Sequence, residues 1–170
     1  MNSLYVFVEG SDDRRFVENI YSEQIQSSYG ECTIVEYAQD RPTKVNAFIK
    51  SIKSMPGADY IFLVDFDGRV NKKEITARKY KQLEIEKIFL VKFEIEAWII
   101  SGLDKDQLLK LKITDNLNDT EKITKEKFEK IIPKNFVNKL DFCTYIYENY
   151  NLNYAVSVNH SLQVFNSNIT

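Results

Sequence analysis

Short runs of apolar, β-forming residues alternate with helical stretches, and this alternation constrains the fold more than any other feature of the sequence. The runs cover residues 4–8, 33–37, 60–64 and 88–93, and helical patterns lie between them at 12–26, 42–55 and 74–86. Strands that alternate with helices form parallel sheets, because each helix carries the chain back to the same edge. The sequence therefore predicts an α/β fold with a mostly parallel, four-stranded sheet flanked by helices.

The rest of the chain is expected to be helical. Beyond Gly102, stretches rich in Asn and Lys replace the strand pattern, and from Asp141 to about Val164 aromatic and aliphatic residues recur at helical intervals. A chain of 170 residues is long enough to bury one core of moderate size. We therefore expect an α/β core at residues 1–102 that carries the functional site, and a helical extension at residues 103–170 that packs on this core.

Composition and charge narrow the class of protein. The hydrophobic share of 44% and the charged share of 28% are typical of globular proteins, and no run approaches the roughly 18 apolar residues of a membrane helix. No signal-peptide pattern begins the chain, so we expect a cytoplasmic protein without a membrane partner. Acids dominate residues 1–40 and bases dominate residues 69–92. This distribution suits a metal-dependent enzyme that acts on a phosphate backbone, and a solvated helix face is the alternative for the bases.

Acidic side chains follow three of the four predicted strands. Glu9 follows the first strand, Asp65 and Asp67 follow the third, and Glu94 and Glu96 follow the fourth. In a parallel sheet these strand ends lie at one edge, where ligands bind, and residues two apart in an extended chain point to the same side. Carboxylates this close repel one another unless a cation or a proton lies among them, and oxygen ligands favour Mg²⁺, Mn²⁺ or Ca²⁺ over zinc. For Glu94 and Glu96 the alternative is salt bridges to the basic segment at residues 78–87.

Three segments together resemble the TOPRIM domain, which topoisomerases, bacterial primases, ribosomal-RNA maturation nucleases and OLD-family nucleases share. They are, in chain order, EGSDD at residues 9–13, DFD at 65–67 and EIEAW at 94–98. The resemblance covers roughly residues 3–102 and implies a TOPRIM-like, Rossmann-like sheet. Within it, Glu9 matches the glutamate that ends the family's first strand, and the DFD segment matches the DxD motif that ends its third strand.

The resemblance also implies a function. EGSDD and EIEAW are similar to segments of OLD-like nucleases and of small stand-alone TOPRIM-related proteins from bacterial mobile-element and anti-phage defence loci. The chain is too short for a topoisomerase or a primase, so the resemblance implies a nuclease that hydrolyses phosphodiester bonds of DNA or RNA with Mg²⁺ or Mn²⁺. An ATPase partner subunit and self-association are further expectations.

The implied site residues fall into three groups. The metal ligands would be Glu9, Asp13, Asp65, Asp67, Glu94 and Glu96. The catalytic residues would be Glu9, Asp65, Asp67, Glu96 and Lys92, and Arg69 and Lys72 are further cations for the phosphate.

Other interpretations of the DxD segment stay open. DFDG at residues 65–68 also resembles the DxDG motif of haloacid-dehalogenase-type phosphatases, in which the first aspartate is the nucleophile. In this chain, however, Arg69 follows the glycine and two strands precede the motif. A DxD after an apolar strand also occurs in nucleotide-sugar glycosyltransferases. The non-enzymatic alternative is a TOPRIM-like module that binds nucleic acid or a partner ATPase without cutting, and metal-dependent cleavage would distinguish it from the nuclease.

Overall fold

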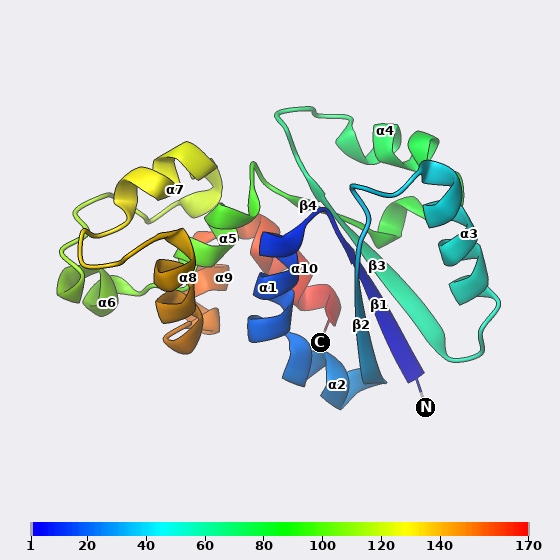
Figure 1. Cartoon of the computed structure of the whole chain (residues 1–170), viewed down its shortest axis with the longest axis horizontal. Helices are drawn as coiled ribbons and strands as arrows, with labels where there is room; N and C mark the ends of the chain where they lie inside the picture. The colour runs from blue at the N-terminus through cyan, green and yellow to red at the C-terminus, as the bar shows by residue number, and fades with distance from the viewer. Residues whose placement is uncertain (1, 170) are drawn as a thin grey trace. The chain divides into compact units, whose positions relative to one another are not determined.

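The computed structural model describes residues 2–169, which divide into two compact units (Figure 1). Unit 1 contains the chain up to Leu90 together with Ile169, and unit 2 is Val91–Asn168. By this division residues 91–102, which we expected in the first domain, group with the helical second unit.

Unit 1 is built on a parallel, four-stranded sheet, and this confirms the predicted fold class. The strands are β1 (Asn2–Val8), β2 (Gly30–Glu36), β3 (Ala58–Asp65) and β4 (Ile88–Val91), in the order β2-β1-β3-β4. β1 pairs in parallel with both of its neighbours, so that Val6 lies opposite Ile34 of β2 and Ile61 of β3. The carboxyl ends of these strands therefore lie at the same edge of the sheet.

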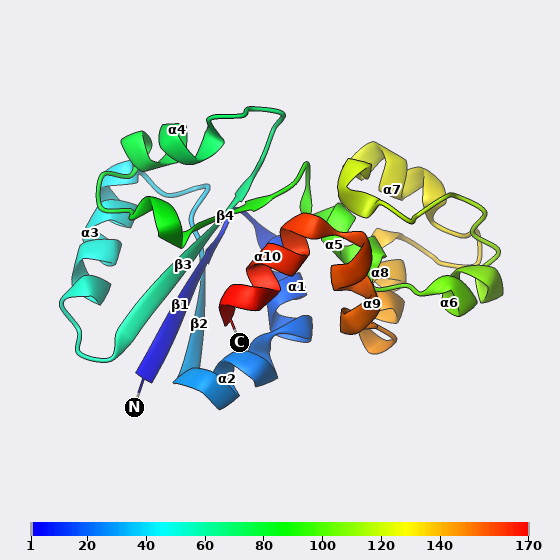
Figure 2. The ribbon, with the colours of Figure 1, turned by 180° about the vertical axis from the view of Figure 1, so that it is seen from behind.

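Helices cover both faces of this sheet, as Figures 1 and 2 show. On one face lie α1 (Ser11–Ile20) and α2 (Ser22–Tyr29), and on the other lie α3 (Pro42–Lys53) and α4 (Lys72–Lys79). The single helix predicted at residues 12–26 is two helices, because the buried Tyr21 leaves helical geometry with φ −118°. The helix predicted at 74–86 ends at Lys79, and only a short 3-10 turn, η1 (Ile85–Lys87), follows it.

Side-chain alternation along the strands sorts the core of unit 1 into two layers. Phe7 of β1 and Phe62 of β3 stack at 5.4 Å in the layer under α3 and α4, where Ile49 and Tyr80 join them. The residues that alternate with these on the strands, such as Val6, point to the opposite face, which α1 and α2 cover. Burial of each such side chain contributes about 1.5–3 kcal/mol, so both layers hold the strand ends in place.

Unit 2 is helical, which agrees with the predicted helical C-terminal region. Its elements are α5 (Ile95–Ser101), α6 (Lys105–Lys110), η2 (Thr120–Lys122), α7 (Lys125–Ile131), α8 (Lys139–Glu148), α9 (Leu152–Val158) and α10 (His160–Ile169). Every residue of α5 is buried, and α7, α8 and α9 contact it. Trp98 of α5 packs on Phe165 at 5.1 Å and donates its Nε1–H to the Ser161 hydroxyl at 2.8 Å. This helix is therefore the centre of the unit.

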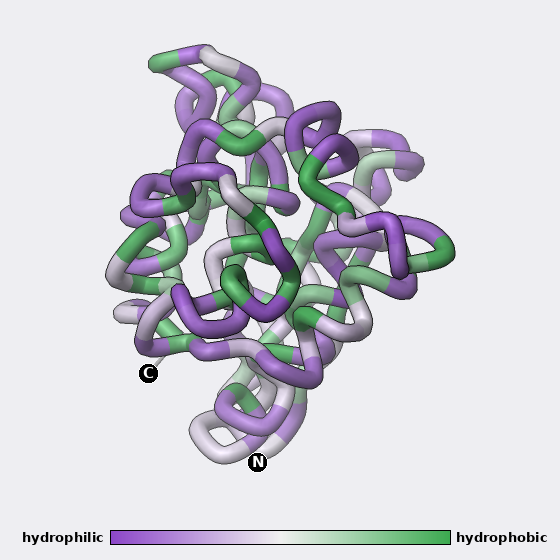
Figure 3. Tube along the Cα trace, turned by 90° about the vertical axis from the view of Figure 1, so that its left-hand side faces the viewer, coloured by the Kyte–Doolittle hydropathy of each residue, from purple (hydrophilic) through white to green (hydrophobic). Residues whose placement is uncertain are grey.

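Apolar residues are distributed in short segments along the chain. In Figure 3, hydrophobic and hydrophilic residues are interspersed along the whole trace. Among residues 2–169, no helix combines the length and the apolar character that crossing a membrane requires.

Candidate functional site

Glu9 follows β1, and its carboxylate reaches the neighbouring strand. Its Oε1 atom accepts a hydrogen bond from the backbone N–H of Asp65 at 3.2 Å and another from the Tyr37 hydroxyl at 3.2 Å. β1 and β3 are adjacent and parallel, so Glu9 and Asp65 leave the same edge of the sheet. The Glu9 carboxylate and the Asp65 backbone are thus side by side at the carboxyl edge, where α/β proteins bind ligands.

The Asp65 side chain leaves this edge in a different direction from that of Glu9. Val64 lines the same pocket as Glu9, and successive side chains of a strand point to opposite faces of a sheet. Asp65 therefore points to the face that α1 covers, and one of its carboxylate oxygens is fully buried. The two acids flank the edge of the sheet from its two faces.

Asp67 departs from the extended geometry that the predicted metal site assumes. Its φ is +48° and that of Gly68 is +69°, so the chain turns sharply after Asp65. The exposed Asp67 carboxylate forms an ion pair with Lys72, the first residue of α4. The expectation that Asp65 and Asp67 project to one side of an extended chain is therefore wrong.

Asp13 closes the N-terminus of α1. Its side chain is only 6% exposed, and Oδ2 accepts a hydrogen bond from the backbone N–H of Gly10 at 3.2 Å. An acid in the first turn satisfies a free backbone donor and complements the helix dipole. This contact accounts for Asp13 as part of the turn from β1 into α1.

Lys92 and Glu94 have partners within unit 2. The Lys92 ammonium forms an ion pair with Glu121 at 2.7 Å. Glu94 is the N-cap residue of α5, and its carboxylate accepts a hydrogen bond from the backbone N–H of Lys125. These contacts tie the segment before α5 to η2 and to the start of α7.

Glu96 is buried in unit 2 and carries an ion pair. Its side chain is 5% exposed, and its Oε1 lies 2.6 Å from Nζ of Lys139 on α8. Because α5 begins at Ile95, Glu94 and Glu96 do not share one side of an extended chain, and this part of the prediction is wrong. Glu96 pairs with Lys139 instead of the basic segment at residues 78–87 that was the alternative.

The acids of the described chain do not form a ready-made metal cage. Among residues 2–169, no three Asp, Glu, His or Cys side chains gather in a group that could hold a metal ion. Proteins often hold Mg²⁺ differently, with one or two carboxylates, several waters and oxygens of the substrate phosphate. Because Glu9 and Asp65 flank the sheet from its two faces, they do not fit a closed cage, and only an open site that uses one or two carboxylates suits this edge.

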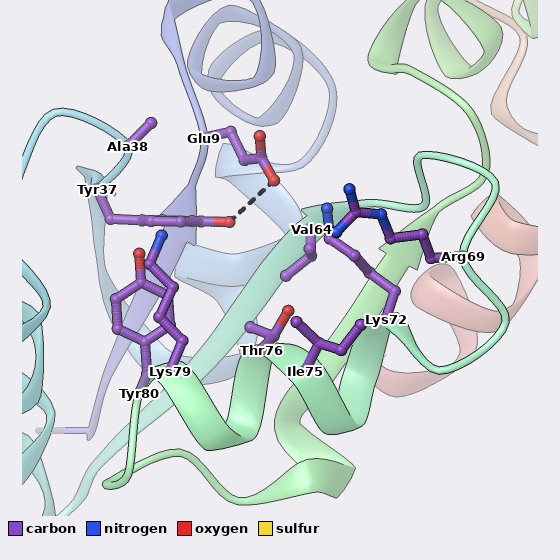
Figure 4. Close-up of a pocket in the computed structure, with 10 residues that line it drawn as sticks. All are labelled: Glu9, Tyr37, Ala38, Val64, Arg69, Lys72, Ile75, Thr76, Lys79 and Tyr80. Carbon is purple, nitrogen blue, oxygen red and sulfur yellow. Dashed lines mark hydrogen bonds between the residues drawn. The ribbon is translucent and has the colours of Figure 1, made fainter.

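A pocket of about 310 Å³ lies beside Glu9 in unit 1 (Figure 4). Its polar lining consists of Glu9, Tyr37, Arg69, Lys72, Thr76 and Lys79. Three cationic side chains thus surround one carboxylate, so the pocket favours anions. The sequence analysis identified Glu9, Arg69 and Lys72 but missed Tyr37, Thr76 and Lys79. The spacing of Lys72, Thr76 and Lys79, four and three residues apart, indicates one helical face and could have revealed Thr76 and Lys79.

Tyr37 holds Glu9 at the wall of this pocket. Tyr37 directly follows β2, and its side chain is buried. Its hydroxyl lies 2.9 Å from the carbonyl oxygen of Leu63 and 3.2 Å from Oε1 of Glu9. Burial, followed by the charge of Glu9, raises the pKa of Tyr37, so the hydroxyl keeps its proton and acts as a donor. Tyr37 therefore helps to fix the Glu9 Oε1 atom, which also accepts the hydrogen bond from the Asp65 backbone.

Comparison of the chain with models of known protein families, with curated proteins and with solved structures gave no match. Fold and site together define an α/β protein with a cationic pocket at the carboxyl edge of a parallel sheet. The resemblance to the TOPRIM domain rests on the three sequence segments at residues 9–13, 65–67 and 94–98.

Proposed function

We propose that this protein is a nuclease of the TOPRIM type, which hydrolyses phosphodiester bonds of DNA or RNA with Mg²⁺ or Mn²⁺. One observation carries the proposal. The Glu9 carboxylate lies 3.2 Å from the backbone nitrogen of Asp65, beside a pocket lined by Arg69 and Lys72. Two acids and two cations at the ligand-binding edge of a parallel sheet are the side chains that hydrolysis of a phosphodiester requires.

The residues of unit 1 would divide the chemistry among them. Asp65 and oxygens of the substrate phosphate would bind the metal ion. Asp67 would become a further ligand once its ion pair with Lys72 is broken. When bound, the ion supplies a Lewis acid that polarises the scissile phosphate. Glu9, held by two hydrogen bonds, would take a proton from or return one to a reacting oxygen. Arg69 and Lys72 would neutralise charge on the phosphate.

We further propose the partners and setting that follow from the likeness to OLD-like nucleases. Nucleic acid would be the substrate, and a separate ATPase subunit would be the partner. The protein would then act in the cytoplasm, in a bacterial mobile-element or anti-phage defence system.

Cleavage of plasmid DNA and of RNA by the purified protein tests the proposal. Mg²⁺ or Mn²⁺ should support cleavage, EDTA should abolish it, and Asp65→Asn should lower the rate by about 100-fold or more. Glu129→Gln removes an exposed acid of α7 and is the matched control, which should cut at the wild-type rate. Cleavage that persists in EDTA, or in the Asp65→Asn variant at the wild-type rate, would rule out this assignment.

A second function, binding of nucleic acid or of a partner ATPase without cleavage, is favoured by a separate observation. Lys72 already engages Asp67, and no three acids gather among the residues that the structure describes. In this case the cations of the pocket would bind phosphates of the backbone, and no bond would break. A shift of labelled oligonucleotide in a native gel, with no cleavage in Mg²⁺ or Mn²⁺, would support this second function.

A further inference from the structure

The Thr76 side chain on α4 is mostly buried, and its hydroxyl has no hydrogen-bond partner among residues 2–169. Thr76 is 5% exposed, and Figure 4 shows its oxygen pointing into the pocket. Other helical hydroxyls bond the preceding turn, as Thr144 does with the carbonyl oxygen of Leu140 at 3.0 Å. A hydroxyl without a protein partner can bond to water or to a ligand that enters the pocket. Thr76 therefore offers a donor to a ligand in the pocket.

Two cationic side chains of the pocket also have no acidic partner in the part of the chain that the structure describes. Arg69 and Lys79 form no ion pair there, and the Lys79 ammonium lies 5.0 Å from the centre of the Tyr80 ring. Lys72 is a third cation, which Asp67 partly neutralises. Since Glu9 is the one acid among the described lining residues, positive charge is in excess.

The donors are arranged to reach one ligand. Lys72, Thr76 and Lys79 are spaced by four and three residues on α4, so they lie on one face of the helix, and all three line the pocket. Arg69 approaches from the loop that precedes α4 (Figure 4). A guanidinium can bind two oxygens of a phosphate at once, and ammonium and hydroxyl groups donate to the others.

We infer that this pocket binds a phosphate group through Arg69, Thr76 and Lys79. The role of this pocket as the subsite for a substrate phosphate beside Glu9 rests on the proposed function. Phosphate binding itself requires neither metal nor cleavage. The phosphate can belong to a nucleic-acid backbone or to a free nucleotide, because both present the same oxygens. The volume of about 310 Å³ is at the lower end of the range for small-molecule sites, and it suits a phosphate with one attached nucleoside.

Titration of ¹⁵N-labelled protein in EDTA tests the inference, with inorganic phosphate, a nucleoside 5′-monophosphate and a single-stranded oligonucleotide as separate ligands. The amide signals of α4 should shift with each ligand. Thr76→Val should weaken phosphate binding by about tenfold or more, because it removes a hydrogen bond to a charged group, whereas Thr76→Ser should retain binding. Thr76→Val should melt at the wild-type temperature or above it, since no protein hydrogen bond is lost.

Paired charge variants control for general attraction of anions. Lys79→Gln should weaken binding, and Lys81→Gln, an exposed neighbour that does not line the pocket, should not. Tighter binding of the oligonucleotide would identify the backbone as the source, and tighter binding of the monophosphate would identify a free nucleotide; both support the inference.

Three results would overturn the inference. They are wild-type affinity of Thr76→Val for phosphate, a lowered melting temperature of that variant, and equal losses of affinity in Lys79→Gln and Lys81→Gln. The phosphate subsite and the nuclease can also fail separately. Phosphate binding without cleavage of any nucleic acid would remove the nuclease and keep the subsite, and cleavage without phosphate binding would do the reverse.

Discussion

The carboxylate of Glu9 lies 3.2 Å from the backbone nitrogen of Asp65, so the acid that follows β1 is anchored on β3. A hydrogen bond to a charged group is worth about 1.5–3 kcal/mol, and this one closes the carboxyl edge of two adjacent strands. Glu9 therefore has both a structural and a proposed chemical role, and these roles can be separated by substitution.

Glu9→Gln should separate them. Glutamine keeps an oxygen that can accept from the Asp65 N–H, so we expect the free energy of unfolding to fall by less than about 1 kcal/mol. It cannot carry or release a proton, so nucleic-acid cleavage should slow by about 100-fold. Urea unfolding and initial cleavage rates measure the two effects. Glu9→Ala is the comparison that should lose both, and wild-type cleavage by Glu9→Gln would contradict the proton-transfer role.

Tyr37→Phe tests what positions Glu9. The substitution removes the hydroxyl that contacts the Leu63 carbonyl oxygen at 2.9 Å and Glu9 at 3.2 Å. We expect the free energy of unfolding to fall by about 1–3 kcal/mol. Tyr145→Phe, in unit 2, is the matched control and should change stability by less than about 0.5 kcal/mol. Equal free energies of unfolding for the two variants would show that the Tyr37 hydroxyl does not stabilise the fold.

Glu96 should prove to be a structural residue of unit 2 rather than a metal ligand. Its carboxylate is 2.6 Å from Lys139, and the two side chains are 5% and 23% exposed. Loss of one partner of a buried ion pair lowers the free energy of unfolding by about 3–5 kcal/mol. Because Lys139 is partly exposed, we expect Glu96→Gln to lower it by about 2–3 kcal/mol. Thermal unfolding of this variant, of Lys139→Met and of the double variant measures the coupling. Additive losses, or a lowered affinity for Mn²⁺ in a folded Glu96→Gln protein, would contradict this role.

Asp104 should give unit 2 an acid-sensitive stability. Its carboxylate caps α6, and the backbone N–H of Gln107, 3.0 Å away, is the main cause of its lowered pKa. A group whose pKa is lower in the folded state stabilises the fold above its unfolded pKa of about 3.9, and this contribution is lost as the pH falls through the folded pKa. Asp104→Asn keeps a capping oxygen without a charge. Its free energy of unfolding should therefore fall less steeply than that of the wild type between about pH 6 and pH 3. Identical pH profiles would contradict the expected linkage.

The fold was predictable because its signals are local. Each strand is an apolar run, each connection in unit 1 contains a helix, and these two facts fix a parallel sheet. The break at Tyr21 was missed because a buried aromatic residue is compatible with a continuous helix, and only the backbone shows that α1 ends there. Helix boundaries depend on such tertiary contacts, whereas the alternation of elements does not.

The candidate site was predictable only where it depends on strand order. Glu9 and Asp65 lie at the same edge of the sheet because β1 and β3 are neighbours. The turn at Asp67 was missed, although Asp67-Gly68 is itself a turn signal that competes with an extended DxD. The partners of Glu96 and Glu9 could not be predicted, since Lys139 and Tyr37 lie far away in the sequence and no periodicity links them.

Binding of Mn²⁺ followed by paramagnetic broadening of backbone amide signals tests the central claim most directly. If Asp65 and Glu9 border the metal site of a nuclease, the amides of Gly10 and Phe66, next to these acids in the chain, should broaden first. Addition of a non-cleavable oligonucleotide should strengthen the effect, because phosphate oxygens complete an open site. Asp65→Asn should remove it. Broadening that begins elsewhere in the chain, or that is unchanged in Asp65→Asn, would contradict the claim.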